Sequence, residues 1–500
     1  MKIVFRVDAS RLIGSGHVMR CLVLADELKR NGHQVLFACL TLYGDMRPFI
    51  TERGFDVISL SPPQSELTPT HDTDYTAWLQ KSVDEDAKDF ILNVVSADLV
   101  ITDHYAIGKE WQSQIIKALQ CRLVAIDDLA RCHQADLILD QTLGRSESDY
   151  VESSGRVLVG CEYALLKRDF ANKREAAVSR ELTTGIPKIL ISMGGVDSPN
   201  ATLKVLKALY ANVDADFTVL LPPSSPHFEK VKEWCSRRER VEHIEFIRAM
   251  ASLMLKHDVA IGAPGTTSWE RACLGLPNIV VPLADNQKMI CEQLVNNNAT
   301  IQVNLEDIPS RILEAYQEIL TQWDSFKSSN LALCDGRGVK RVVLELDYLF
   351  SNKTDHVSLV YASHDDISLV YEWQCHPETR KYALRPAVPT RNEHRVWMAE
   401  KLSSVTDYFY LVTDRLSGMK IGAVRLDRVR TNHYLISIFV DPTRHGQGIA
   451  SRALAIIDAI HPDITIHATI LRENLASQRL FQKVGYQKVA EQTYIRQPVE

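Results

Sequence analysis

Two glycine-rich turns hold the residues whose types and spacing could do chemistry, and they lie near opposite ends of the 500-residue chain. Gly14-Ser15-Gly16-His17 follows one short apolar run, and the stretch RHGQGIA at 444–450 follows another. A helical pattern comes next in both places. Such a turn can bind a diphosphate, because the backbone N–H groups at a helix start and the helix dipole attract anions. Two turns so far apart predict two activities on one polypeptide.

His17 is the side chain of the first turn that could move a proton. A neutral imidazole at a helix start can accept a proton from water near neutral pH. The flanking Gly14 and Gly16 let the backbone approach a ligand and adopt unusual dihedral angles. The alternative is a tight turn with a capping histidine and no chemistry, since a short glycine motif alone has little specificity.

Alternating strands and helices must position the first turn. Apolar runs that predict buried strands alternate with amphipathic stretches, of which 19–31 has helical spacing. The expected strands are 3–7, 34–38, 99–102, 123–126 and 137–139, and then 188–192, 217–221, 259–261 and 278–282. This alternation indicates βαβ units and parallel sheets. We therefore predict two Rossmann-like domains, 1–170 and 186–345, with a hinge at 170–186 and a ligand crevice between them.

The last part of the chain has a different pattern of apolar and polar residues. A polar stretch at 351–355 predicts a linker. Beyond it, 357–500 begins with a helical section and continues with hairpin-like strands expected at 408–413, 420–427 and 434–440. The second glycine turn and its helix follow the last of these strands. We predict a third domain here.

Composition and charge exclude several classes of function. The net charge of −6 offers no basic field for nucleic acid, and no apolar run is long enough to cross a bilayer. The ten cysteines include no C-x-x-C pair, which argues against a zinc knuckle or a redox motif. Scattered cysteines in a long chain indicate reduced thiols and a cytoplasmic protein. The N-terminal run meets charge too soon for a signal peptide. The sequence contains no cluster of carboxylates that would predict a metal site.

The segment from Arg6 to Cys21 resembles the opening of the nucleotide-sugar hydrolase family of pseudaminic acid biosynthesis, which removes UDP from UDP-2,4-diacetamido-2,4,6-trideoxy-β-L-altropyranose. The resemblance covers about residues 1–345. Further matching segments are Asp103-His104-Tyr105, Ile126-Asp127-Asp128, GCEYALL at 160–166 with Phe170, ISMGGVD at 191–197 and GAPGTTSWE at 262–270.

This resemblance implies a two-domain glycosyltransferase-B-like fold, with His17 as the base that activates water for attack on the anomeric carbon. UDP would leave from the opposite face with inversion. Asp8, Asp103 and Tyr105, at strand ends, would orient His17 or hold the acetamido sugar, and paired Asp127 and Asp128 either do the same or cap a helix. The complete set expected to bind the UDP-sugar is Asp8, Gly14, Gly16, Arg20, Asp103, Tyr105, Gly194, Gly195, Gly265, Thr266, Thr267, Glu270, Asn286 and Gln287.

Each predicted contact in the second domain has a plainer alternative. Gly194-Gly195 would offer backbone donors to the leaving diphosphate, or form an ordinary strand-to-helix turn. Gly265-Thr266-Thr267 would bind phosphate at a helix start. Glu270 matches the family's acceptor of ribose hydroxyl groups, yet an acid in a first helical turn also complements the dipole. Asn286-Gln287 matches a segment that contacts the donor sugar, or forms a solvated helix start.

The last domain resembles the GNAT-type N-acetyltransferases over about residues 357–495. The segments that carry this resemblance are Asp441-Pro442, the turn at 444–450 and NLASQRLFQKVGY at 474–486, with Trp373, Arg380, His394 and Trp397 upstream. The family implies acetyl-CoA as co-substrate and direct attack of a neutral amine on the thioester. The residues expected to bind acetyl-CoA are Phe439, Val440, His445, Gly446, Gln447, Gly448, Ile449, Ala450 and Asn474.

Two positions depart from the acetyltransferase pattern. His445 stands where the family usually has Arg or Gln, which removes one phosphate contact. Phe481 stands where a tyrosine acid is frequent and cannot donate a proton, and we interpret nearby Tyr486 as a core residue. His433 or His394 could be the base, or either could be a surface or packing histidine.

The two resemblances together predict a bifunctional enzyme that first acetylates the 4-amine of UDP-4-amino-4,6-dideoxy-N-acetyl-β-L-altrosamine and then hydrolyses the product. The association follows from the order of steps in the pathway. Its partners would be the nucleotide sugar and acetyl-CoA. The alternatives are a glycosyltransferase with an accessory CoA-binding or acyltransferase domain of other substrate, a scaffold in place of the acetyltransferase, or a sugar-nucleotide-binding regulator. Neither the oligomeric state nor the sugar stereochemistry follows from the sequence.

Overall fold

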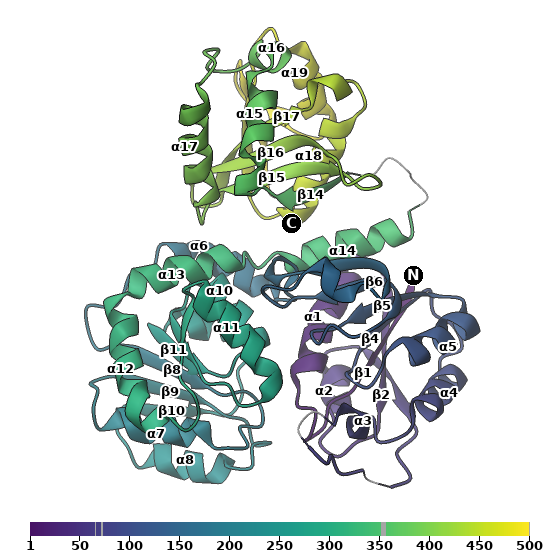
Figure 1. Ribbon diagram of the computed structural model, residues 1–500, viewed down its shortest axis with the longest axis vertical. Helices are drawn as coiled ribbons and strands as arrows, with labels where there is room; N and C mark the ends of the chain where they lie inside the picture. The colour runs from purple at the N-terminus through teal and green to yellow at the C-terminus, as the bar shows by residue number, and fades with distance from the viewer. Residues whose placement is uncertain (66, 72–73, 352–356, 500) are drawn as a thin grey trace. The chain divides into compact units, whose positions relative to one another are not determined.

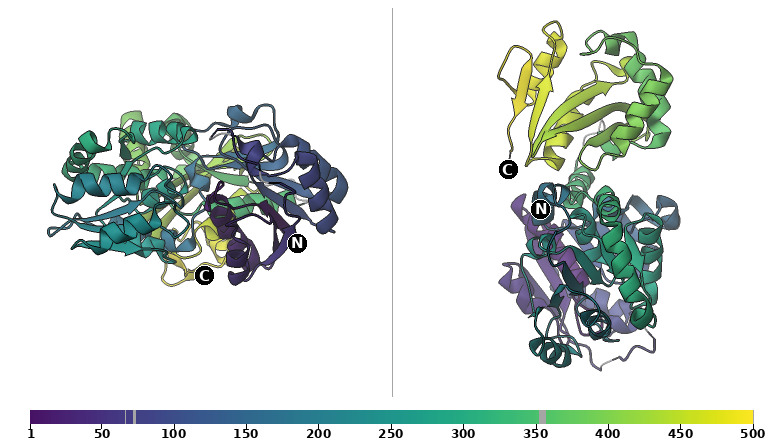
Figure 2. Two further views of the ribbon diagram at one scale, coloured as in Figure 1. Left: turned by 90° about the horizontal axis from the view of Figure 1, so that it is seen from below. Right: turned by 90° about the vertical axis from the view of Figure 1, so that its left-hand side faces the viewer.

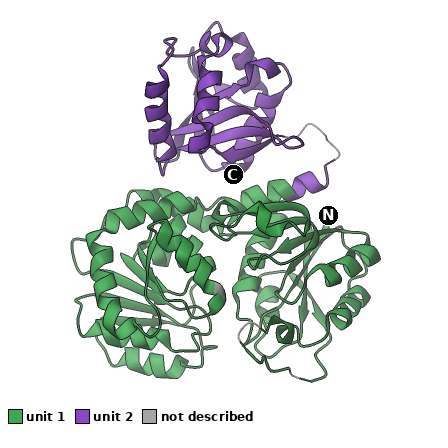
Figure 3. Cartoon of the chain, in the orientation of Figure 1, with its two compact units in different colours: residues 1–345 green, residues 346–500 purple. Residues whose placement is uncertain are grey.

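The computed structural model describes residues 1–65, 67–71, 74–351 and 357–499. The chain forms two compact units, unit 1 at 1–345 and unit 2 at 346–500 (Figure 3). Most of the linker predicted at 351–355 lies outside the described residues. Among the described helices, none combines the length and the apolar character needed to cross a membrane.

The first lobe of unit 1 is built on a wholly parallel seven-stranded sheet in the order β3-β2-β1-β4-β5-β6-β7. Its strands are β1 (Lys2–Val7), β2 (Gln34–Leu40), β3 (Asp56–Leu60), β4 (Leu99–Asp103), β5 (Arg122–Ile126), β6 (Gln134–Asp140) and β7 (Ser154–Val159). Its helices are α1 (Gly16–Arg30), α2 (Arg47–Glu52), α3 (Tyr75–Trp78), α4 (Val83–Asn93) and α5 (Lys109–Leu119). Every predicted strand of this lobe is present.

The second lobe has a parallel six-stranded sheet in the order β10-β9-β8-β11-β12-β13. Its strands are β8 (Lys188–Ser192), β9 (Asp216–Leu220), β10 (Val241–Ile244), β11 (Val259–Gly262), β12 (Asn278–Val280) and β13 (Thr300–Gln302). Its helices are α7 (Ala201–Tyr210), α8 (Phe228–Ser236), α9 (Met250–Leu255), α10 (Thr266–Cys273), α11 (Lys288–Asn296), α12 (Ile308–Thr321) and α13 (Trp323–Leu333). Helices flank both sheets of unit 1 (Figure 1, Figure 2).

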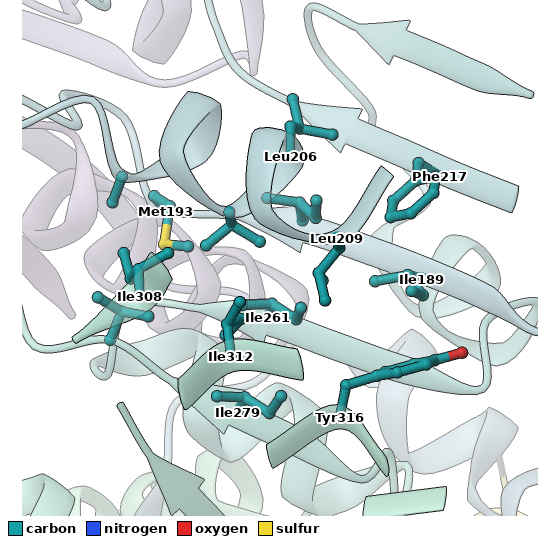
Figure 4. Packing of buried hydrophobic residues seen from close by; sticks show 14 of the residues in the cluster. Ile189, Met193, Leu206, Leu209, Phe217, Ile261, Ile279, Ile308, Ile312 and Tyr316 are labelled. Carbon is teal, nitrogen blue, oxygen red and sulfur yellow. The ribbon is translucent and has the colours of Figure 1, made fainter. Parts of the chain in front are cut away.

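Continuous apolar strands produce two cores in the second lobe, one on each face of its sheet. Ile189 of β8 packs with α7 and α12 on one face, as Figure 4 shows, and Ile191 belongs to the same cluster. Leu190, between them in sequence, packs on the other face against α6 and α10. Neighbouring side chains of a strand point to opposite faces, so a strand that is covered on both sides must be apolar throughout.

Two helices join the lobes of unit 1. α6 (Arg168–Val178) takes up much of the stretch predicted as a hinge, and its Phe170 and Ala177 pack in the second lobe. α14 (Gly338–Leu349) returns to the first lobe, where Lys340 Nζ lies 2.9 Å from Glu27 of α1. Arg168 also pairs with Glu27, at 3.0 Å. One buried carboxylate on α1 thus fastens both connecting helices.

Unit 2 has a mixed sheet in the order β14-β15-β16-β17-β18-β20-β19. Its strands are β14 (Val357–Tyr361), β15 (Tyr408–Asp414), β16 (Lys420–Arg430), β17 (His433–Val440), β18 (Thr465–Thr469), β19 (Gln487–Lys488) and β20 (Thr493–Arg496). Its helices are α15 (Ile367–Cys375), α16 (Pro377–Arg380), α17 (Arg391–Leu402), α18 (Ile449–Ile460) and α19 (Leu475–Lys483). The neighbouring strands β17 and β18 run parallel and pair only from His433 to Leu435, so the rest of β17 is free of β18.

Candidate active sites

The candidate site of the first lobe centres on His17 and Asp103. Gly16 begins α1, which places His17 in its first turn, and Asp103 is the last residue of β4, next to β1 in the sheet. His17 Nδ1 lies 2.6 Å from Asp103 Oδ1. Because an ionised carboxylate can only accept a hydrogen bond, His17 Nδ1 carries a proton, and in the neutral ring Nε2 keeps a free electron pair.

Arg20, one turn after His17, holds Asp103 in place. Its Nη2 and Nε donate to the two carboxylate oxygens at 2.6 and 2.7 Å, and its Nη1 donates to Asp128 at 3.0 Å. Burial opposes ionisation of Asp103, but the charge of Arg20 and the hydrogen bonds from Arg20 and His17 outweigh it and hold the pKa of this carboxyl well below its usual range. Arg20 is therefore already paired with two carboxylates, and the substrate contact predicted for it stays a prediction.

Among the described residues no hydrogen bond or ion pair joins Asp8 to His17, so the roles offered to Asp8 stay predictions. Its side chain is fully buried, where Arg6 Nη1 lies 2.7 Å away and the backbone N–H of Leu40 donates at 2.6 Å. This carboxylate is therefore enclosed and already paired with Arg6. Asp127 is similarly buried and paired with Arg131 at 2.7 Å. Tyr105, by contrast, packs its ring edge-on against His17 at 4.6 Å.

Two glycine loops of the second lobe carry residues predicted to bind the diphosphate. A Cβ added to Gly195 would lie 3.5 Å from Ser15 Oγ, so the loop after β8 meets the turn that carries His17. Gly194 has φ +87° and Gly265 has φ +153°, and a Cβ at either would meet nothing within 4 Å. Gly265 directly precedes α10, whose first residues are Thr266 and Thr267. At both loops the backbone is therefore accessible to a ligand, and at Gly265 it lies directly before a helix.

Glu270 lies one turn into α10 and is partly buried. Burial raises the pKa of Glu270 to about 7, against the opposing charges of Lys167 and Arg271. Arg271 is itself buried under the loop and donates to Ala263 O at 3.2 Å. Glu270 therefore lies where it gains or loses a proton near neutral pH.

The segment predicted to contact the donor sugar is only partly described. Gln287 accepts a hydrogen bond from the backbone N–H of Leu283 at 2.8 Å, which fixes its side chain against its own loop. Its amide nitrogen is the group left for a ligand. The side chain of Asn286 lies outside the described part of the structure.

In unit 2, the part of β17 free of β18 leads into the second glycine turn. Phe439 and Val440 end β17, and Gly446 and Gly448 adopt φ of +80° and +73°. Gly446, Gln447 and Gly448 are exposed, and α18 begins at Ile449 with Ala450. His445 is also exposed, and its Nε2 lies 3.3 Å from Val440 O. An open strand edge followed by free N–H groups at a helix start suits an extended ligand that ends in a diphosphate.

The remaining predicted residues of unit 2 fall into two groups. Asn474 Oδ1 accepts from Ser477 N at 3.0 Å and caps α19, so its NH₂ group is what a ligand could use. Tyr486 and Phe481 are both buried and in edge contact at 4.9 Å, which agrees with the core interpretation of Tyr486.

The two candidate histidine bases differ in their surroundings. His433 Nδ1 lies 2.9 Å from His467 Nε2, at the paired end of β17 and away from the glycine turn. His394 is buried beside Tyr371 and Trp397, and neither of its ring nitrogens has a hydrogen-bond partner among the described residues. Buried polar groups are normally satisfied, so His394 is the better placed to take a ligand or a water.

Comparison with known proteins matches both units. Residues 356–487 match the acetyltransferase (GNAT) domain model, and 199–332 match the glycosyltransferase family 28 C-terminal domain model. A curated relative from Campylobacter jejuni, UDP-2,4-diacetamido-2,4,6-trideoxy-beta-L-altropyranose hydrolase, is 27% identical over 48% of this chain and 77% of its own length. An uncharacterized protein of Methanocaldococcus jannaschii is 24% identical over 98% of this chain and 97% of its own.

A solved structure agrees with the fold of unit 1. MurG of Acinetobacter baumannii is similar with a TM-score of 0.50 and 14% identity, covering 69% of this chain and 99% of that one. Unit 1 thus has a glycosyltransferase-B-like fold, and the chain also contains a GNAT acetyltransferase domain. More particularly, its first part is a hydrolase-like region, and the GNAT domain is fused behind it. Among the described residues, no group of three or more metal-ligating side chains is gathered.

Proposed function

We propose that unit 1 hydrolyses a UDP-linked 2,4-diacetamido-2,4,6-trideoxy sugar, with the β-L-altropyranose as the substrate, and releases UDP and the free sugar. The observation that carries this proposal is the hydrogen bond of 2.6 Å between His17 Nδ1 and Asp103. It fixes the tautomer that leaves Nε2 basic, as a water-activating imidazole requires. The relative from Campylobacter jejuni supports the choice of substrate.

In the proposed reaction, His17 Nε2 accepts a proton from water while the water oxygen forms a bond to the anomeric carbon. The bond between that carbon and the diphosphate oxygen breaks, and its electron pair leaves with UDP. Attack from the face opposite the leaving group inverts the configuration. Asp103 stabilises the imidazolium that forms, and Arg20 keeps Asp103 ionised during the step.

The second lobe would bind the leaving group. Backbone N–H groups around Gly194, Gly195 and Gly265 would donate to the diphosphate, where negative charge grows as the bond breaks. Thr266 and Thr267, at the start of α10, would add donors. Glu270, as the carboxylate, would accept hydrogen bonds from the ribose hydroxyl groups.

We further propose that unit 2 acetylates the 4-amine of the preceding UDP-4-amino sugar with acetyl-CoA. The amine nitrogen attacks the thioester carbonyl, the carbon–sulfur bond breaks, and the thiolate takes up a proton. The turn at 444–450 would bind the pyrophosphate of CoA, the open edge of β17 would lie along the pantetheine, and Asn474 would donate to it. The acetylated UDP-sugar would then be the substrate of unit 1, so the two fused units would catalyse consecutive steps.

A second candidate is a glycosyltransferase that passes the sugar to an acceptor. It is favoured by the match of 199–332 to a glycosyltransferase domain. The two candidates differ in one respect: a hydrolase needs only water and releases free reducing sugar, whereas a transferase releases UDP quickly only when its acceptor is present.

Mass spectrometry of products tests both proposed activities in one experiment. The purified protein is incubated with the 4-amino UDP-sugar, with and without acetyl-CoA. We expect the acetylated UDP-sugar to appear first and free diacetamido sugar with UDP to follow. Acetylation without UDP release would contradict the hydrolase, and a 4-amino UDP-sugar that stays unacetylated in the presence of acetyl-CoA would contradict the acetyltransferase.

A further inference from the structure

An aromatic cluster lies beside His17 and includes two residues that the proposed reaction leaves unassigned. The ring of Tyr105, which contacts His17, is also in edge contact with Tyr75 at 4.8 Å. Trp78 stacks on Tyr105 at 5.5 Å with an interplanar angle of 30°. Tyr75 and Trp78 touch each other at 4.8 Å. These two side chains of α3 therefore lie one ring contact beyond the residue that touches the base. We call Tyr75 and Trp78 the aromatic wall.

Local hydrogen bonds hold the aromatic wall in position. Asp74 caps α3 by accepting from Ala77 N at 3.3 Å, and it also accepts from Thr70 N at 3.1 Å. Gln80 exchanges two hydrogen bonds with the backbone of Leu67, at 2.8 and 2.6 Å. A helix of only four residues has little stability of its own, so these contacts are what fix the two rings.

The wall is not explained by core packing alone. Ala77 is the buried residue of α3, whereas Tyr75 and Trp78 are only half-buried. Large half-exposed aromatic rings next to a catalytic group are typical of ligand sites, because they offer apolar area at low entropic cost. The wall also has a polar border: Asp128 pairs with Arg20 at 3.0 Å, and burial together with the charge of Asp128 raises the pKa of the Tyr75 hydroxyl.

We propose that Tyr75 and Trp78 determine specificity by binding the apolar substituents of the donor sugar, namely the acetamido methyl groups and the methyl group of a 6-deoxy carbon. The inference rests on the proposed function of unit 1. The sugar, and not the uridine, is the part that must lie at His17, because the base has to reach water at the anomeric carbon. Methyl groups packed on aromatic rings gain from burial, whereas a hydroxyl in the same place loses its hydrogen bonds to water.

Trp78→Ala is the principal test, with Trp78→Phe as the conservative variant. Trp234→Ala is the matched control, because Trp234 is a half-buried tryptophan of α8 that packs on Arg238. Three quantities are measured: kcat/KM for the diacetamido-trideoxy donor, the Kd of UDP, and the inhibition constant of UDP-N-acetylglucosamine, which keeps hydroxyl groups at carbons 4 and 6. Circular dichroism and Tm check folding.

For Trp78→Ala we expect kcat/KM to fall by about 10- to 100-fold, with the Kd of UDP within about 2-fold of wild type. The inhibition constant of UDP-N-acetylglucosamine should change less than kcat/KM, and Trp78→Phe should recover most of the loss. An unchanged kcat/KM, or an equal loss of UDP affinity, would overturn the proposal. If the wild type releases no UDP, the proposed function fails by itself. Calorimetric binding of the intact donor, compared with UDP, then decides whether the wall recognises the sugar.

Discussion

At the residue scale, the chemistry proposed for unit 1 depends on which nitrogen of His17 carries the proton. The ring is 8% exposed, and its Nδ1 faces Asp103 while Tyr105 covers one edge. An asparagine at 17 could still donate to Asp103 but has no basic nitrogen. We therefore expect His17→Asn to lower UDP release by about 10²- to 10⁴-fold, the usual contribution of a general base, while acetylation of the amino sugar continues.

The two activities of His17→Asn can be followed in one assay of UDP and of the acetylated sugar. His33→Asn, just after the far end of α1, is the matched control and should retain both activities. UDP release within a few-fold of wild type in His17→Asn would show that another group activates the water.

Glu270 gives a pH prediction for donor binding. Burial raises its pKa to about 7, and only the ionised form can accept a hydrogen bond at both oxygens. Binding to ribose hydroxyl groups therefore favours proton loss, so donor affinity should rise with pH below about 7, by up to tenfold per unit, and level off above it. Calorimetry with the UDP-sugar on a His17→Asn background measures this. Glu270→Gln should bind with a flatter pH profile, and an identical profile in both variants would exclude Glu270 as the titrating group.

Residue types and local motifs indicated the base and offered Asp8, Asp103 and Tyr105 as its partners, but not which of them it contacts. His17 could be selected from Gly14-Ser15-Gly16-His17, whereas its bond to Asp103 joins residues 86 positions apart and needs the β1–β4 pairing. The same limit applies to Asp8, whose pairing with the buried Arg6 was not predicted, because a carboxylate at a strand end looks the same in sequence whether it faces a ligand or an arginine. The aromatic wall was missed altogether, because no spacing links Tyr75 and Trp78 to Tyr105.

At the element scale, the strands missed in unit 1 share one property. They are β3, β7, β10 and β13, the four edge strands of the two parallel sheets. Central strands such as β8 are covered on both faces and appear in the sequence as unbroken apolar runs. An edge strand is partly exposed and contains polar residues, such as Glu242 and His243 in β10. The hydrophobic pattern therefore located the central strands, which carry the candidate site, but not the edge strands.

The second glycine turn gives a prediction at this scale. Gly448 has φ +73°, and a Cβ there would lie 3.3 Å from Arg452 Nη1. Gly448→Trp should both strain the backbone and fill the space before α18, so we expect acetyl-CoA affinity to fall by at least about tenfold while UDP release is unchanged. Fluorescence or calorimetric titration with acetyl-CoA measures the effect.

Gly485→Trp is the control for backbone strain. Gly485 also has a positive φ, +92°, with open space around it, and it follows the end of α19 opposite to Asn474. The Gly485→Trp variant should bind acetyl-CoA nearly as well as wild type. Equal loss in both variants would attribute the effect to misfolding of unit 2, and full affinity in Gly448→Trp would remove the turn from the CoA site.

At the scale of the whole molecule, the chain consists of two compact units that each contain a core and a candidate site. A unit with its own core can unfold as a cooperative body of its own. Ligands that bind only the folded form raise its stability by mass action. Each substrate should then stabilise one unit and leave the other unchanged.

Differential scanning calorimetry of the full chain should accordingly show two transitions. Acetyl-CoA at about 100 times its Kd should stabilise unit 2 by about 2.7 kcal/mol, and a UDP-sugar at the same excess should stabilise unit 1 by a similar amount. The scan is measured on the His17→Asn chain, so that the donor is not consumed. The Gly448→Trp variant assigns the transitions, because it should lose only the shift caused by acetyl-CoA. A single transition moved by both ligands would mean that the units unfold together, in which case the fusion couples their stabilities as well as their reactions.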